Sequence, residues 1–187
     1  VQTCALPIYE FSINNFNDVL VNPSNELTLW NADEENSSED YERFVVRSGI
    51  CNGRLIGGNL SIMVSLIGTD YDVNLKDAIY FIEDIGEEPY SIDRMLTQMI
   101  QANKFKDAAG IVFGVCSKCI SKPDESGIGN SFSIKEILID RLYNLNIPVI
   151  YGFSFGHITN KFTLPFGAKA ELNVNEQTLT LKENAVT

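Results

Sequence analysis

Apolar residues recur along the chain in two alternating patterns from about residue 49 onward. Continuous apolar runs, which are typical of buried strands, occur at 78–82, 110–115 and 147–153. Apolar residues at helical spacing occur between and before these runs, at 60–67, 92–100 and 134–145. Helices and strands in this alternating order predict an α/β layer structure with right-handed crossovers.

Polar residues indicate where two of these helices begin and how the chain ends. Asn59 directly precedes the first helical stripe and is placed to cap it. Ser133 and Glu136 have the spacing of a capping box in front of the last helix. Alternating apolar and polar residues at 168–174 and 178–181 flank a polar turn, which predicts a C-terminal β-hairpin.

The first 48 residues carry weaker patterns. Residues 1–8 resemble translated sequencing-adapter sequence, so we expect a non-native scar there, with a short native strand or loop as the alternative. Apolar spacing predicts a short amphipathic helix over 9–21, with Ser12 as a possible N-cap. Residues 31–40 are acidic and lack periodicity, which predicts a loop or linker.

Composition narrows the classes of function. The chain has 187 residues, of which 44% are apolar and 21% charged, enough for one packed domain or one domain with a remnant of another. Its net charge of −11 argues against binding to a nucleic-acid backbone or to anionic lipid. No apolar run approaches the roughly 20 residues that span a bilayer, and no export signal is visible.

The four cysteines are too few for a disulfide scaffold, but two of them form a C-x-x-C motif at Cys116 and Cys119. A structural zinc site would need two further ligands, and no second pair exists. A redox pair would be expected to open a helix after a strand, whereas this motif leads into a polar loop. From the sequence we therefore expect ordinary reduced thiols.

Two side chains suited to acid–base chemistry follow predicted strands. Glu83 comes directly after the run at 78–82, and His157, the single histidine, follows the run at 147–153. Sites in open α/β sheets gather at the carboxyl ends of strands, where a carboxylate can orient an imidazole. The alternative is a structural role for both residues, because periodicity does not show whether their strands are neighbours.

Five segments, in order, resemble the LD-carboxypeptidases, a family of serine peptidases with murein-recycling and microcin-immunity members. The segments are Gly53–Leu60, Gly68–Tyr71, Phe81–Tyr90, Ile92–Gln98 and Tyr151–His157. In that family an N-terminal domain carries the nucleophilic serine, and a C-terminal domain supplies a glutamate and a histidine. The resemblance matches these to Glu83 and His157, with His157 as general base.

The resemblance also implies a reaction, but one part of the family's catalytic site has no counterpart in the matched segments. It implies hydrolysis of the L,D peptide bond that releases D-alanine from a murein tetrapeptide in peptidoglycan recycling, with no metal or organic cofactor. The serine-bearing domain is absent from this match, so we expect the chain alone to be inactive. Trp30 is a candidate substrate-binding residue, and packing on its own domain is the equal alternative.

The resemblance implies the organisation as well. We expect a small swivelling β/β/α-type C-terminal domain over 49–187, preceded at 9–48 by a remnant of the N-terminal domain and a linker. The family implies a cytoplasmic protein, a peptide substrate and a homodimer of the full-length protein. Two alternatives stay open, namely a microcin C-type immunity peptidase and a non-catalytic binding or interaction module.

Overall fold

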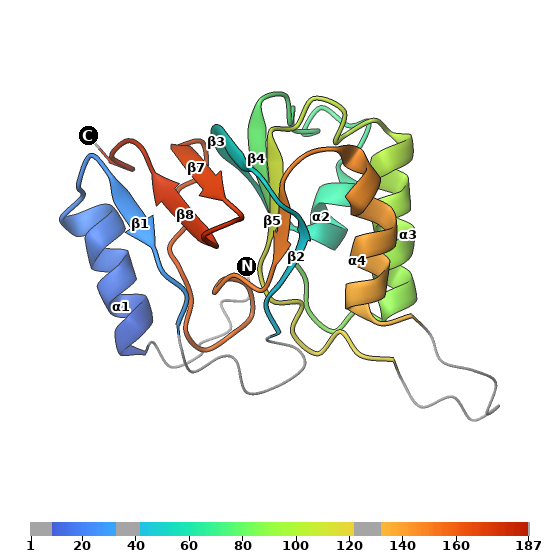
Figure 1. The fold of residues 1–187 in the computed structure, drawn as a ribbon, viewed down its shortest axis with the longest axis horizontal. Helices are drawn as coiled ribbons and strands as arrows, with labels where there is room; N and C mark the ends of the chain where they lie inside the picture. Colours follow the sequence, from blue (N-terminus) through green and yellow to red (C-terminus); the bar gives the residue numbers. More distant parts are fainter. Residues whose placement is uncertain (1–8, 33–41, 122–131, 187) are drawn as a thin grey trace.

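The computed structural model describes residues 9–32, 42–121 and 132–186, and within them an eight-stranded mixed sheet forms the centre (Figure 1). The strands are β1 (Leu27–Leu29), β2 (Phe44–Arg47), β3 (Ile50–Asn59), β4 (Ala78–Glu83), β5 (Gly110–Phe113), β6 (Val149–Tyr151), β7 (Lys169–Asn173) and β8 (Thr178–Leu181). Their spatial order is β1-β8-β7-β3-β4-β5-β6-β2. Strands β3 to β6 run parallel, and the remaining pairs are antiparallel. The predicted α/β class is confirmed.

The helices lie on both sides of this sheet. They are α1 (Glu10–Phe16), the π-helical turn η1 (Asn17–Val21), α2 (Leu60–Ser65), α3 (Pro89–Gln101), α4 (Ile134–Leu142) and the 3-10 turn η4 (Tyr143–Leu145). Helices α2, α3 and α4 pack together on one face, and α1 lies at the opposite end beside β1 (Figure 1).

The predicted strands β4, β5, β6 and the β7–β8 hairpin are confirmed, whereas three strands are missed. Strands β1 and β2 are short edge strands with little periodicity. Strand β3 has ten residues but contains three glycines, which weaken the strand signal. One of these glycines is required by packing, because a Cβ on Gly57 would lie 1.8 Å from the backbone oxygen of Phe81 on β4.

The predicted helix starts are confirmed at two positions and wrong at one. The Asn59 side chain accepts a hydrogen bond from the Ile62 N–H, and Ser133 with Glu136 forms the capping box. Ser12 is not an N-cap, because Tyr9 occupies that position and Ser12 lies inside α1. Its hydroxyl instead accepts from the Lys161 N–H at 3.0 Å, tying α1 to the segment after His157.

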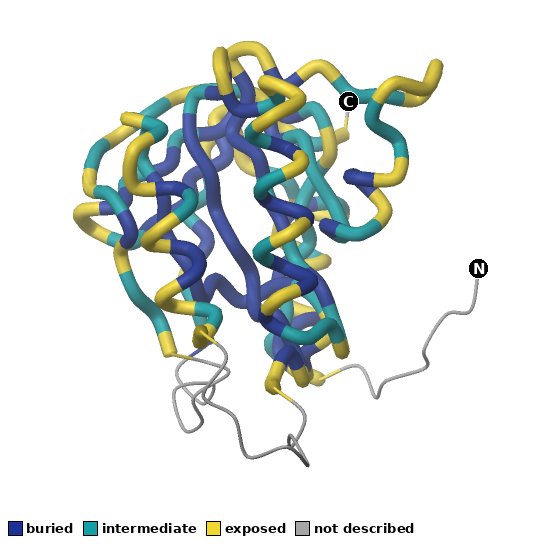
Figure 2. The backbone as a smooth tube through the Cα atoms, turned by 90° about the vertical axis from the view of Figure 1, so that its right-hand side faces the viewer, coloured by how far each residue is buried: buried dark blue, intermediate teal, exposed yellow. Residues whose placement is uncertain are grey.

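Two hydrophobic cores fill the space on either side of the sheet. One packs α2, α3 and α4 against the sheet, and the other lies between the opposite face, the C-terminal hairpin and η1. The backbone is most deeply buried along the central strands, and the outer surfaces of the helices are exposed (Figure 2).

Strand β4 sends alternate side chains into the two cores. Ile79 joins the core beside the hairpin, whereas Tyr80 and Ile82 join the core beneath the helices. Because side chains alternate along a strand, Glu83 follows the direction of Ile79, and the next residue, Asp84, faces the helices. This alternation sends the two neighbouring acids toward different partners.

The described residues of 9–48 are integrated into the same sheet. Strand β1 pairs with β8, and β2 pairs with β6, so both edges of the sheet come from this N-terminal part. The proposed scar at 1–8 and most of the predicted linker at 31–40 lie outside the described residues. The division into a remnant and a C-terminal domain stays a prediction.

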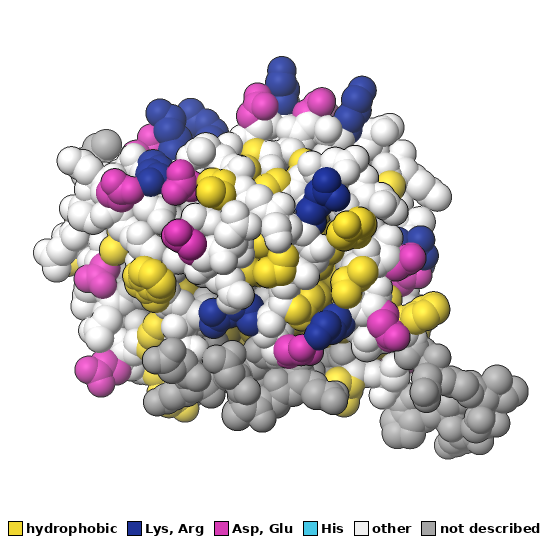
Figure 3. Space-filling model, in the orientation of Figure 1, with side chains coloured by type: hydrophobic (Ala, Val, Ile, Leu, Met, Phe, Trp, Pro, Cys, Tyr) yellow, Lys and Arg dark blue, Asp and Glu magenta, His cyan; other side chains and the backbone are white. Residues whose placement is uncertain are grey.

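The surface agrees with the charge argument from the sequence. On the face drawn in Figure 3, lysine and arginine side chains are scattered among acidic ones instead of forming one patch. Across 9–32, 42–121 and 132–186, no helix has both the length and the apolar character needed to cross a membrane.

Candidate active site

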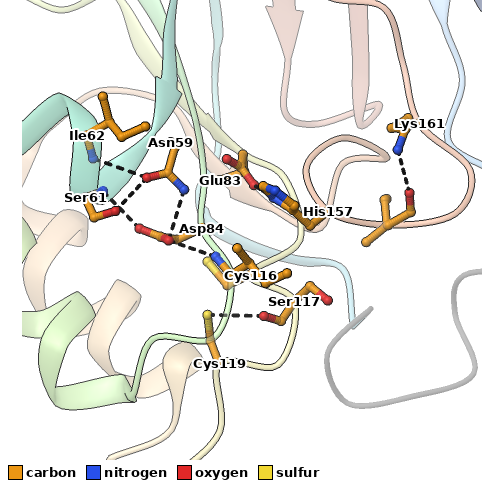
Figure 4. A network of polar contacts seen from close by, with 12 residues as sticks. Asn59, Ser61, Ile62, Glu83, Asp84, Cys116, Ser117, Cys119, His157 and Lys161 are labelled. Atoms are coloured by element: carbon orange, nitrogen blue, oxygen red, sulfur yellow. Dashed lines mark hydrogen bonds and ion pairs between the residues drawn. The ribbon is translucent and has the colours of Figure 1, made fainter. Parts of the chain in front are cut away.

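Glu83 and His157 come together at the carboxyl ends of the parallel strands. Nδ1 of His157 lies 2.8 Å from Oε2 of Glu83, a hydrogen-bond distance (Figure 4). The side chain of Glu83 is 12% exposed and that of His157 is 39% exposed. The glutamate is therefore shielded, while the histidine remains open to a partner from outside.

The chemistry of this contact fixes the role of each ring nitrogen. An ionised carboxylate can only accept a hydrogen bond, so the Nδ1–H of His157 is the donor to Glu83. In the neutral imidazole the second nitrogen, Nε2, then carries a free lone pair. Glu83 thus holds His157 in the tautomer that a general base needs.

A glycine allows the two residues to approach. Val115 after β5 pairs with Gly156 after β6, which carries the chain back across the strand ends toward β4. Gly156 has φ +110°, and a Cβ there would lie 3.1 Å from both Cβ and Oε2 of Glu83. Any larger residue would be strained and would push against the carboxylate that His157 contacts.

The neighbouring acid, Asp84, has a different and wholly buried environment. Its carboxylate accepts hydrogen bonds from Nδ2 of Asn59 at 3.0 Å, from the Ser61 N–H at 2.9 Å and from the Ile85 N–H at 2.8 Å (Figure 4). These bonds join the end of β4 to the start of α2. Asp84 is therefore a structural anchor beside the site, a role that the sequence alone does not assign.

Ser154 is the central residue of 152–156, which have the G-x-S-x-G spacing of a serine nucleophile elbow. Our interpretation of the sequence missed this spacing. The Ser154 hydroxyl is buried and accepts a hydrogen bond from the Ala32 N–H at 3.1 Å. An elbow serine lies exposed on a turn from a strand into a helix, whereas the next described element after Ser154 is strand β7. Ser154 therefore serves structure and not nucleophilic attack.

Trp30 lies beside the loop that carries His157. It is 67% exposed at the end of β1. The next residue, Asn31, donates from Nδ2 to the Gly152 carbonyl at 2.8 Å and accepts from the Ser154 N–H at 3.1 Å. These bonds hold the residue next to Trp30 against the loop that leads to His157, while Trp30 itself is exposed.

The arrangement of Glu83 and His157 has the geometry that proton transfer by an oriented imidazole requires. Among the described residues, no three His, Cys, Asp or Glu side chains are grouped closely enough to hold a metal ion. A base oriented by a carboxylate activates a hydroxyl or thiol nucleophile by removing its proton. The geometry of Glu83 and His157 supplies two of the three parts of such a site.

Comparison with known sequences points to one family. The family described as the LD-carboxypeptidase C-terminal domain matches residues 52–172. The probable murein peptide carboxypeptidase of Bacillus subtilis is 38% identical over 134 residues, covering 72% of this chain and 41% of that protein. The microcin C7 self-immunity protein MccF of Escherichia coli is 26% identical over 142 residues, covering 73% of this chain and 38% of that protein.

Comparison with known structures agrees with the sequences. The crystal structure of muramoyltetrapeptide carboxypeptidase from Oxalobacter formigenes matches with a TM-score of 0.73 and 28% identity, covering 92% of this chain and 54% of that one. The chain thus spans about half or less of the length of these proteins.

Proposed function

The chain belongs to the LD-carboxypeptidase family, and from that premise we propose that it supplies the glutamate–histidine half of a serine-type peptidase site. One observation carries the proposal, namely the 2.8 Å contact between Nδ1 of His157 and Oε2 of Glu83. That contact leaves Nε2 of a half-exposed histidine available to a nucleophile.

In the proposed mechanism His157 acts first as a base and then as an acid. Its Nε2 takes the proton of a serine hydroxyl as that oxygen attacks the carbonyl carbon of the scissile peptide bond. The imidazolium that forms is stabilised by the Glu83 carboxylate and then gives its proton to the leaving amine. In the second half-reaction His157 takes a proton from water as the water attacks the acyl-enzyme, and it then gives that proton to the departing serine oxygen.

We place the nucleophilic serine in a part of the protein beyond these residues. The one serine here with the elbow spacing, Ser154, is buried and bonded to Ala32. The chain also spans only 41% of the Bacillus subtilis relative, which leaves room for a second domain. The same proposal makes the isolated chain inactive, because a base without its nucleophile has nothing to activate.

The proposed substrate is a murein tetrapeptide, cleaved at its L,D bond to release D-alanine in peptidoglycan recycling. The similarity to a probable murein peptide carboxypeptidase of Bacillus subtilis and to muramoyltetrapeptide carboxypeptidase from Oxalobacter formigenes supports this substrate class. Trp30 is proposed to line the peptide groove, since it is exposed and the next residue, Asn31, is bonded to Gly152 on the loop that leads to His157. We further propose that the full-length protein is a cytoplasmic homodimer.

The test compares three purified proteins, namely the complete protein, its His157→Ala variant and the 187-residue chain alone. The measurement is D-alanine release from a murein tetrapeptide. The expected result is turnover by the complete protein, a loss of about 10³-fold or more in kcat/KM for the variant, and no turnover by the chain alone.

Two outcomes of that test would overturn the proposal. A near-normal rate for the His157→Ala protein would remove His157 from the mechanism. The absence of peptidase activity in the complete protein, with binding retained, would favour a non-catalytic binding module. Circular dichroism on each variant verifies that a lost rate is not lost folding.

A second candidate substrate class comes from the match to the microcin C7 self-immunity protein. In this alternative the same glutamate–histidine pair serves a microcin C-type immunity peptidase. A competition assay with equal concentrations of a murein tetrapeptide and aspartyl sulfamoyl adenosine, a compound that MccF binds in a solved structure, distinguishes the two. The higher kcat/KM identifies the class, and we expect it for the tetrapeptide.

A further inference from the structure

The C-x-x-C motif occupies a tight turn directly after β5. The Cys119 N–H donates to the Cys116 carbonyl at 3.3 Å, and Lys118 in the third position has φ +58°. A β-turn of this kind holds its first and fourth Cα atoms within about 7 Å, and disulfide-bonded cysteines have Cα atoms about 4.4–6.8 Å apart. The turn therefore already holds the two cysteines near the spacing of a disulfide.

The two cysteines also lie close together and line a common cavity. The Cys119 thiol donates to the Ser117 carbonyl at 3.7 Å, and Cys116 and Cys119 both lie beside the end of β4 (Figure 4). They line a cavity of about 410 Å³. Another lining residue, Ile120, is 63% exposed, so the cavity opens to the surface near the two buried cysteines.

The surroundings shift the pKa values of the two thiols in opposite directions. The pKa of Cys119 is lowered because its sulfur accepts hydrogen bonds from the Cys116 thiol and from the backbone at Glu87 and Gly86. The pKa of Cys116 is raised, first because its thiol donates to Cys119 and then because it is buried. Burial raises the pKa of Cys51, which lies on β3 outside this cavity, to about 11.

We propose that Cys116 and Cys119 form an oxidisable dithiol, which a small hydroperoxide converts to a disulfide through the adjoining cavity. The Cys119 thiolate attacks one peroxide oxygen, forming a sulfenic acid and releasing an alcohol, or water from hydrogen peroxide. The Cys116 sulfur then attacks the sulfenic sulfur, forms the S–S bond and releases water. The two cysteines are oxidised by two electrons, and the peroxide is reduced by two.

Oxidation of the two cysteines would alter a turn that is bonded to the segment next to the candidate active site. The Ser117 N–H, between the two cysteines, donates to the Asp84 carbonyl at 3.1 Å, and the Gly86 N–H donates to the Ser117 carbonyl at 2.8 Å. The turn is thus bonded to the segment that follows Glu83. The dithiol stands apart from the proposed peptidase role, because its chemistry needs neither Glu83 nor His157.

The test is a peptide map of the reduced 187-residue chain treated with hydrogen peroxide in buffer containing a metal chelator. Free thiols are then alkylated and the protein is digested with trypsin, which cuts after Lys118 and so separates the two cysteines. A disulfide joins the two resulting peptides. The expected result is this joined pair, formed while Cys51 is still alkylated.

The rates and two variants sharpen the test. We expect Cys119 to react about 10-fold faster than Cys51, because the larger thiolate population of Cys119 is partly offset by the weaker nucleophilicity of a thiolate of lower pKa. Cys51→Ser is the matched control and should leave the joined peptides unchanged. Cys116→Ser should stop at a Cys119 sulfenic acid, which dimedone labels.

Three results would overturn the inference. They are oxidation of Cys51 at the rate of Cys119, disulfides only between separate chains, and persistence of both thiols at peroxide levels that oxidise free cysteine. The map of the unsubstituted chain decides the question by itself if replacing the buried Cys116 impairs folding.

Discussion

The two faces of the sheet differ sharply at the end of β4, where Glu83 and Asp84 follow each other in the chain. On the face of the hairpin core, Glu83 contacts one half-exposed partner, His157. On the helix-covered face, Asp84 is buried and accepts three hydrogen bonds from groups of its own domain. The carboxylate on the hairpin face therefore has one side-chain partner, whereas the carboxylate on the helix-covered face has three hydrogen-bond donors.

This difference indicates that Asp84 contributes to stability, whereas Glu83 belongs to the proposed site. A carboxylate whose hydrogen-bond partners are all internal, like Asp84, anchors structure and has no capacity for a substrate. A carboxylate that orients an imidazole with a free nitrogen, like Glu83, leaves a reactive atom for another molecule. Substitutions at the two positions should accordingly affect different measurements.

The largest effect is expected for Glu83→Gln in the complete protein. The amide can donate as well as accept, so it no longer selects the tautomer of His157 and cannot stabilise its protonated form. We expect kcat to fall by about 10³–10⁴-fold, with KM changed far less. Steady-state kinetics on a murein tetrapeptide is the measurement.

The free energy of unfolding provides the control for Glu83→Gln. Because the contact with His157 is partly open to solvent, urea denaturation should show a change below about 1 kcal/mol. A large loss of stability with activity per folded molecule retained would reverse the roles assigned to the two faces.

The next effect is expected for Asp84→Asn, and it concerns stability. The asparagine amide would face an N–H group of Ser61 or of Ile85, so a buried donor would lose its acceptor. We expect a destabilisation of about 2–3 kcal/mol, measured as a shift of the urea midpoint at unchanged m-value. The matched comparison is Glu83→Gln, and equal destabilisation by both would contradict the distinction between the faces.

The contrast between these acids also indicates how far the sequence can predict this molecule. Continuous apolar runs predict β4, β5 and β6 because parallel strands are buried on both faces, and the resemblance to a family predicts that Glu83 and His157 act together before any geometry is known. Strand β3 is missed because Gly53, Gly57 and Gly58 carry no apolar signal, although the close approach of Gly57 to Phe81 requires a small residue.

Other features depend on contacts between distant segments, which periodicity does not encode. Asn31 reaches Gly152 across 121 positions, and Ser12 reaches Lys161 across 149. The turn that brings Cys116 near Cys119 has Lys118 in the left-handed region, which the sequence pattern does not indicate. Contacts between distant segments also explain why Ser12 bonds to Lys161 and does not cap a helix.

A smaller effect is expected for Asn59→Ala on the helix-covered face. Asn59 caps α2 and donates to Asp84, so its removal should destabilise the protein by about 1–2 kcal/mol. Ser133→Ala is the matched control, since it removes the other helix cap at an exposed position away from Asp84. A double-mutant cycle should show coupling of Asn59 with Asp84 and additivity of Ser133 with Asp84.

The smallest effect is expected for Asp72→Asn, beyond α2 on the same side of the sheet. Asp72 contacts Nζ of Lys104 at 2.5 Å, and this hydrogen bond holds the pKa of the carboxyl below its ordinary value of 3.8. A carboxyl whose pKa is lower in the folded state contributes stability at pH values above its ordinary pKa, and that contribution is lost as the pH falls through the folded pKa.

Thermal unfolding at pH 7 should therefore show a loss below about 1 kcal/mol for the Asp72→Asn variant, because the pair is partly exposed. The difference between the two proteins should begin to shrink as the pH falls below about 4, where unfolded Asp72 becomes protonated, and should vanish below the lower folded pKa, where Asp72 is protonated in both states. A difference that persists at low pH would mean that Asp72 acts through packing and not through its charge.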